Sequence, residues 1–130
     1  MYLCMAASMI ALVLPVTAYS EPSISSGYQK CLQNVDIHAM KSGQWTACAE
    51  EDLRALDVKL NAAYKTLKNK SAPEQREFLT RGQRAWLKYR EDWCRYEEAS
   101  ELAPGGPANY IFCMKDMTEK QVENLEGMIQ

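Results

Sequence analysis

The stretch CAEEDLRALDVKLNAAYKTLKNKSAPEQREFLTRGQRAWLKYREDWC, residues 48–94 of a chain of 130, decides the fold. Apolar side chains recur every three or four residues on both sides of a break at 69–73, which is the period of an amphipathic helix. No proline or glycine interrupts residues 44–70. Two long helices joined by a tight connection predict an antiparallel hairpin.

The ends of both helices carry local signals. The first helix is expected to begin near Ser42, and the second to run from about Pro73 to Ser100. Ser71 is expected to cap the second helix, with Glu74 as the other half of a capping box. Gly82 interrupts that helix, and a close approach of the first helix near residues 62–63 would explain it.

Shorter helices flank the hairpin. An amphipathic segment at 28–35 precedes it, and the loop at 103–107, with two prolines and two glycines, follows it. A short helix is expected at 110–115, and a last helix capped by Thr118 with Gln121 in the capping-box position. The predicted class is all-α: an antiparallel helical hairpin with shorter flanking helices and no strand.

The N-terminus resembles a leader. Residues 3–16 are almost wholly apolar, small residues follow, and the first charged residue is Glu21. This pattern predicts a signal peptide at 1–20, cut after Ala18 or Ser20, and one domain at 21–130. The segment before the apolar run lacks a basic residue, so a buried N-terminal helix remains the alternative. We expect a periplasmic or secreted protein with no membrane anchor after cleavage.

Cleavage would leave an even number of cysteines: Cys31, Cys48, Cys94 and Cys113. In a short exported chain this number predicts two disulfides. Local pairing, 31 with 48 and 94 with 113, is favoured. The hairpin geometry offers the alternative, 48 with 94 and 31 with 113. No metal is expected, because no cysteine pair has CxxC spacing and His38 is the single histidine.

The charge is nearly balanced, with 15 basic and 17 acidic residues. A net charge of −2 indicates neither a nucleic acid nor an anionic membrane as partner. No motif for a cofactor is present, and none is expected.

Several blocks of the sequence match a known pattern: Cys48, Leu56-Asp57, LNAAY at 60–64, QRAWLKYR at 83–90, and Cys94. In these blocks the chain resembles the LprI-like lysozyme-inhibitor domain family, over Cys31 to about Leu125. It departs from the family at Gln121, where arginine is usual, and at Trp45, where a smaller apolar residue is common.

The resemblance implies a small helical envelope protein that binds and inhibits a cell-wall-degrading hydrolase, with a lysozyme or related peptidoglycan hydrolase as partner and no enzymatic activity of its own. Two alternatives stay open: an immunity protein against a delivered toxin, and a non-enzymatic partner in envelope assembly.

A polar cluster between the two long helices is predicted from their antiparallel register, as a structural network. Its members are Asp57, Asn61, Tyr64, Gln83, Trp86, Tyr89 and Arg90. A catalytic role for Asp57 is the weaker reading, because no nucleophile or second acid accompanies it. Trp86 and Trp93 are expected in the core, although with Trp45 they could line a groove for sugar or peptide.

The loop after the second helix is the expected contact surface for a partner. Its residues are Pro104, Gly105, Gly106, Pro107 and Asn109. Rigid prolines above a disulfide present a preorganised protrusion, with backbone or Asn109 amides as donors. Acidic residues at 97, 98 and 101 would steer a basic partner. A plain connector is the alternative.

Overall fold

The computed structural model describes residues 26–36, 42–102 and 104–129; the predicted signal peptide at 1–20 lies outside these ranges. Within them the chain forms four helices and no strand, so the predicted all-α class is confirmed. The helices are α1 (Ser26–Gln33), α2 (Ser42–Lys70), α3 (Pro73–Glu98) and α4 (Gly106–Gly127). In these ranges no helix combines the length and apolar character needed to cross a membrane.

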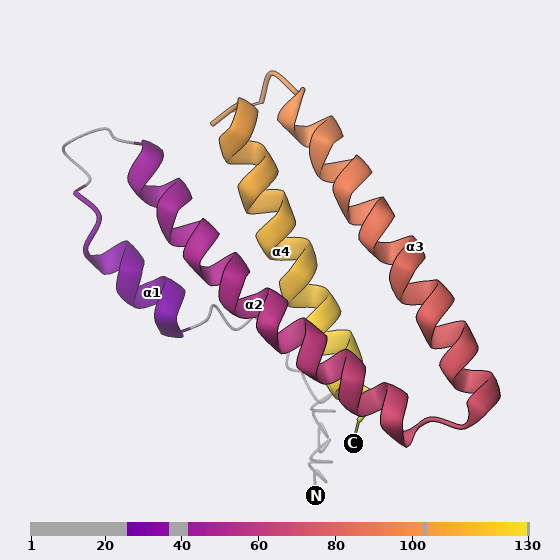
Figure 1. Ribbon diagram of the computed structural model, residues 1–130. Coiled ribbons are helices and arrows are strands. Elements are labelled where there is room, and N and C mark those ends of the chain that lie inside the picture. Colours follow the sequence, from indigo (N-terminus) through magenta and orange to yellow (C-terminus); the bar gives the residue numbers. More distant parts are fainter. Residues whose placement is uncertain (1–25, 37–41, 103, 130) are drawn as a thin grey trace, which may run out of the picture.

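Helices α2 and α3 form the two arms of the predicted antiparallel hairpin, but the arms diverge from the turn, and α4 lies between them (Figure 1). Helix α4 packs against both arms, whereas α2 and α3 touch each other much less. Helix α1 packs along the first half of α2 (Figure 1). The core therefore forms around α4 rather than at a direct α2–α3 interface.

The apolar core joins α2 to α4. Leu56, Leu60 and Ala63 of α2 pack against Val122 and Leu125 of α4. Partly buried side chains from α2, from α3 and from the turn after α4 close this cluster: Tyr64, Leu67, Leu79, Trp86 and Ile129. A second cluster surrounds the disulfide between α3 and α4 and includes Met114.

The turn between α2 and α3 is capped differently from the prediction. Ser71 Oγ donates to the Leu67 carbonyl (2.7 Å), so Ser71 ends α2 instead of starting α3. Ala72 holds the N-cap position, and its N–H donates to Gln75 Oε1 (3.0 Å). The expected roles of Ser71 and Glu74 as a capping box are therefore wrong, whereas Pro73 begins α3 as predicted.

Gly82 does not mark a close helix approach. It is exposed, and a Cβ built on it would meet no neighbouring atom within 4 Å. The prediction that residues 62–63 approach it is wrong, because α4 and not α3 fills the space beside α2.

The two short helices predicted at the C-terminal end are one helix, α4. Thr118 lies inside it, fully buried, and its hydroxyl donates to the Met114 carbonyl one turn back (2.6 Å). A threonine bonded in this way fits a helix interior. The prediction that Thr118 and Gln121 start a new helix is therefore wrong.

Both disulfides are local, as favoured from the sequence. Cys31 is bonded to Cys48, which joins α1 to α2, and Cys94 to Cys113, which joins α3 to α4. The alternative, Cys48 with Cys94 and Cys31 with Cys113, is not the pairing in the structure. Two disulfides are typical of proteins that fold in an oxidising compartment outside the cytoplasm.

The two tryptophans of α3 differ in environment. Trp86 is partly buried against the core, as predicted. Trp93 is 43% exposed, so the prediction that it belongs to the core is wrong. The side chains of α3 that face α4 are instead Gln83, Arg90 and Cys94.

Candidate functional site

The loop between α3 and α4 has a fixed backbone. Gly105 and Gly106 have φ angles of 89° and 53°, in the region that favours glycine. Asn109 Oδ1 accepts from the Gly105 N–H (3.1 Å), and Asn109 Nδ2 donates to the Leu102 carbonyl (2.9 Å). Nδ2 also lies 3.3 Å from the Glu97 carbonyl and from Ser100 Oγ. Asn109 is buried, and its amide holds the loop together from inside.

The loop is anchored at its base and borders a groove on another side. The disulfide between Cys94 and Cys113 lies at its base. On its other side, a groove of about 400 Å³ separates Pro104, Gly105 and Pro107 from the start of α2. The part of the predicted contact surface that reaches the exterior is therefore formed by residues 104–107, with Asn109 as its support.

The predicted polar cluster is brought together for the most part. Five of its members line one groove of about 480 Å³ between α2 and α3: Asp57, Asn61, Tyr64, Gln83 and Arg90. Trp86 contacts this group through Arg90, whose guanidinium lies 5.1 Å from the centroid of the Trp86 ring. Tyr89 does not join them, because it is 54% exposed and contacts Trp93 instead.

Arg90 is the centre of this cluster. Its Nη1 donates to Asp57 Oδ1 (3.2 Å) on α2 and to Thr118 Oγ1 (2.6 Å) on α4. One buried guanidinium thus connects all three long helices. Gln121 Nε2 donates to Gln83 Oε1 (3.0 Å) in the same layer, so the residue that departs from the family pattern is part of this network. The contribution of Thr118 was missed because it was predicted to be a cap.

Tyr64 sits at the basic end of the groove. Its hydroxyl lies 3.1 Å from Thr80 Oγ1, and Lys68 lies over its ring (5.6 Å to the centroid). The hydrogen bond with Thr80, helped by the charges of Lys68 and Arg84, lowers the pKa of the Tyr64 phenol. Asp57, the carboxylate among the residues that line this groove, is ion-paired with Arg90.

A second charged cluster was not predicted. Lys115 of α4 is 4% exposed, and its Nζ lies 3.0 Å from Asp116, 3.1 Å from Glu119 and 4.0 Å from Asp52 of α2. The ring of Tyr28 on α1 covers it at 4.9 Å. Burial disfavours the charged amine, but the hydrogen bonds to Asp116 and Glu119 outweigh burial and raise the pKa of Lys115. The Asp52 and Lys115 side chains are too far apart in sequence for a local pattern to reveal them.

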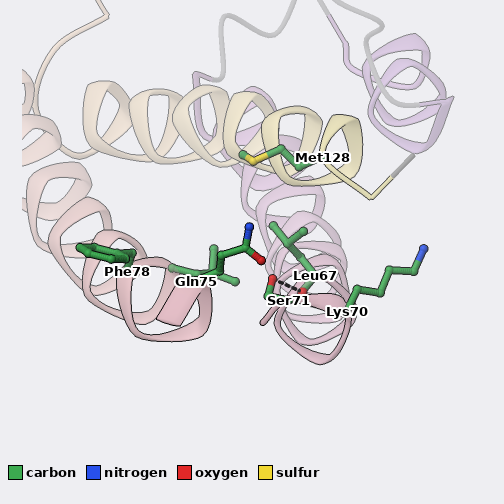
Figure 2. Close-up of a pocket in the computed structure, with 7 residues that line it drawn as sticks. Leu67, Lys70, Ser71, Gln75, Phe78 and Met128 are labelled. Carbon is green, nitrogen blue, oxygen red and sulfur yellow. Dashed lines mark hydrogen bonds between the residues drawn. The ribbon is translucent and has the colours of Figure 1, made fainter. Parts of the chain in front are cut away.

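A largely apolar hollow of about 610 Å³ lies near the turn between α2 and α3, at the opposite end of α3 from the loop at 104–107. Figure 2 shows side chains from the end of α2 and the start of α3 around it, with Met128, which directly follows α4, on another side. Ser71, at the edge of this hollow, donates a hydrogen bond from its hydroxyl to the Leu67 carbonyl in the last turn of α2. Within the described ranges, no group of three or more His, Cys, Asp or Glu side chains is arranged to hold a metal ion.

Comparison with known proteins shows the family of the chain. No curated protein and no solved structure matches the chain. The model of one protein family, described as lysozyme inhibitor LprI, matches residues 34–125. The match spans α2, α3 and nearly all of α4, and includes Cys48, the second disulfide and the polar cluster. The chain therefore belongs to the LprI lysozyme inhibitor family.

Proposed function

We propose that this protein is a periplasmic lysozyme inhibitor that works by binding its target, without catalysis. The observation that carries the proposal is the family match over residues 34–125. The two disulfides support a place outside the cytoplasm. The polar cluster supports a non-enzymatic role, because Asp57 is paired with Arg90.

The loop at residues 104–107 is the proposed contact with the hydrolase. Its last two residues, Gly106 and Pro107, begin the first turn of α4, where the N–H groups of a helix have no partner within the helix, although Pro107 itself has no N–H. The partial positive charge at such a helix end attracts carboxylates, and the cleft of a glycoside hydrolase carries two of them. Asn109 and the nearby disulfide hold the loop in one shape, which lowers the entropy lost on binding.

A cell-wall lysis assay tests the function. The oxidised protein is titrated at low salt into chicken-type, goose-type and invertebrate-type lysozymes. Dose-dependent inhibition of one type is the expected result. Inhibition of none would overturn the proposal and favour an immunity or envelope-assembly role. A pull-down from envelope extract would then identify the partner.

The loop is tested with the double substitution Pro104→Ser and Pro107→Ser, which frees the backbone and keeps both glycines. We expect weaker inhibition with unchanged helicity by circular dichroism. Pro73→Ser, at the other end of the molecule, serves as the matched control. Equal inhibition by the loop variant and the control would place the contact elsewhere.

Export is tested by mass spectrometry of the protein recovered from the periplasm. The proposed cleavage predicts a chain that starts at Tyr19 or Glu21. A chain that retains Met1 would contradict the proposed signal peptide.

A further inference from the structure

The outer face of α3 carries three exposed aromatic side chains one turn apart, Tyr89, Trp93 and Tyr96, which we call the aromatic ladder. They are 54%, 43% and 68% exposed. Neighbouring ring centroids lie 6.1 Å and 5.6 Å apart, so the rings form one continuous strip. None of the three is among the buried or partly buried side chains that make up the core clusters. Large aromatic side chains left on the surface together are typical of binding sites.

The ladder lies in the acidic part of the molecule. Residues 88–101, which include the whole ladder, contain five acidic and three basic side chains, and one of the basic ones, Arg90, is buried in the polar cluster. Residues 65–84, around the hairpin turn, contain six basic and two acidic side chains. The charge is therefore separated along the molecule, although the net charge is only −2.

One acidic side chain at the end of α3 is not offset by a basic residue of the helix. Glu97 and Glu98 lie in its last turn, where the partial negative charge of the helix end disfavours carboxylates. Glu98 is compensated by Arg95 (2.7 Å), but Glu97 accepts a hydrogen bond from the indole N–H of Trp93 (2.7 Å). That bond fixes the exposed indole and places a carboxylate beside it.

The ladder lies on the half of α3 that leads into the proposed loop contact. Helix α3 ends at Glu98, and the exposed Leu102 (75%) connects it to the loop at 104–107. Tryptophan and tyrosine are the side chains that most often dominate the binding energy of protein interfaces. Their few torsion angles lose little entropy on binding.

We propose that the aromatic ladder and the acidic side chains around it form the docking surface for a basic protein, which, on the proposed function, is a lysozyme of net positive charge. Charge complementarity selects this occupant. A second copy of the chain would bring two acidic surfaces together, and like charges repel. The loop then reaches the target beside the ladder, and the basic hairpin turn points away from it.

Inhibition and binding of a susceptible lysozyme test the proposal. We expect Trp93→Ala to weaken both by about tenfold or more, since truncation of a central aromatic contact has effects of this size. Phe78→Ala is the matched control, because Phe78 is an aromatic side chain of the same helix, 59% exposed, at the other end of the molecule. It should bind and inhibit as the unchanged protein does.

Tyr96→Ala provides a second variant in case Trp93→Ala folds poorly, because Tyr96 is more exposed. Glu97→Gln and Glu101→Gln should weaken binding at low salt without lowering the melting temperature. Loss of binding at the ladder with a normal Phe78 variant supports the proposal. Inhibition by both ladder variants at the level of the unchanged protein would overturn it.

The two proposals can fail separately. If the unchanged protein inhibits a lysozyme and the ladder variants do so equally, the docking surface is wrong and the function stands. If the unchanged protein inhibits no lysozyme, both are overturned. Binding of soluble chitooligosaccharide that is lost in Trp93→Ala, together with lysozyme binding that Trp93→Ala leaves unchanged, would overturn the docking surface in favour of a glycan site.

Discussion

Arg90 and Asp57 form one ion pair, but their side chains are buried to very different degrees, 11% and 45% exposed. Arg90 also stacks on Trp86 and donates to Thr118. We expect Arg90→Ala to lower the free energy of unfolding by about 2–4 kcal/mol, because packing and hydrogen bonds in the interior are lost together. Asp57→Asn should cost less than about 1 kcal/mol, since a half-exposed ion pair is screened by water.

Urea unfolding of the two variants gives the comparison. Equal losses would show that the ion pair, and not the packing of the guanidinium, dominates. If Arg90→Ala inhibited poorly but unfolded like the unchanged protein, Arg90 would have a functional role instead.

Gly82 and Gly105 give opposite predictions for the same substitution. Gly82 is exposed inside α3 with open space around it, so Gly82→Ala should stabilise the protein by about 1 kcal/mol. Gly105 has a φ angle of 89°, so Gly105→Ala should destabilise it through backbone strain. Melting temperatures measure both effects. A lower melting temperature for Gly82→Ala would mean that α3 contacts something at this position in solution.

At the scale of elements, Lys115 joins three helices and gives a pH prediction. Its pKa is raised above the ordinary value of 10.5 because hydrogen bonds to Asp116 and Glu119 outweigh its burial. Burial raises the pKa of Tyr28 and of Tyr110 above 10.0, with Glu91 adding to the effect at Tyr110. A raised pKa means that the folded protein holds the proton more tightly than the unfolded chain does. The stability that these three groups contribute should therefore be complete below about pH 10 and be lost as the pH rises beyond it, whereas the lowered pKa of Tyr64 acts in the opposite direction.

Chemical unfolding at a series of pH values between 8 and 11 checks this. Tyr28→Phe keeps the ring over Lys115 and removes one titrating group, so it should reduce the alkaline loss. A free energy of unfolding that stays constant through pH 11 would contradict the assignment.

Helix existence and disulfide pairing were predictable because both depend on local sequence. The uninterrupted pattern at 44–70 and Pro73 place α2 and α3 almost where the structure has them. Each disulfide closes a short loop, of 17 and 19 residues, and the sequence favours this local pairing. The caps were not predictable from type alone, because Ser71 and Thr118 each bond a carbonyl one turn earlier in their own helix. A serine or threonine hydroxyl can either cap a helix N-terminus or bond a carbonyl one turn earlier, and tertiary contacts decide between the two.

At the scale of the whole molecule, the position of α4 is what the sequence did not reveal. A two-helix register places Tyr89 in the polar cluster and Gly82 at a close contact, and both predictions are wrong because α4 separates the arms. The same separation turns Trp93 outward and creates the aromatic ladder. The proposed docking surface thus follows from a tertiary arrangement, although the charge separation beside it can be read from the sequence.

That charge separation predicts how the association rate depends on salt. Between about 10 mM and about 100 mM salt the Debye length falls from about 30 Å to about 10 Å, which screens steering over the length of the molecule. We expect the association rate with a basic lysozyme to fall by about tenfold over this range. Glu97→Lys with Glu101→Lys should slow association at low salt, whereas Trp93→Ala should mainly speed dissociation, because charge acts on approach and packing acts after contact.

Glu74→Lys with Glu77→Lys makes the same change in net charge at the hairpin turn and serves as the control in a stopped-flow or biosensor measurement. If position matters, reversal at the end of α3 slows association far more than reversal at the turn. Equal slowing by the two double variants would mean that only the net charge counts. The acidic end of the molecule would then have no special orientation toward the partner. Support for the aromatic ladder as the docking surface would then come only from faster dissociation of the Trp93→Ala variant.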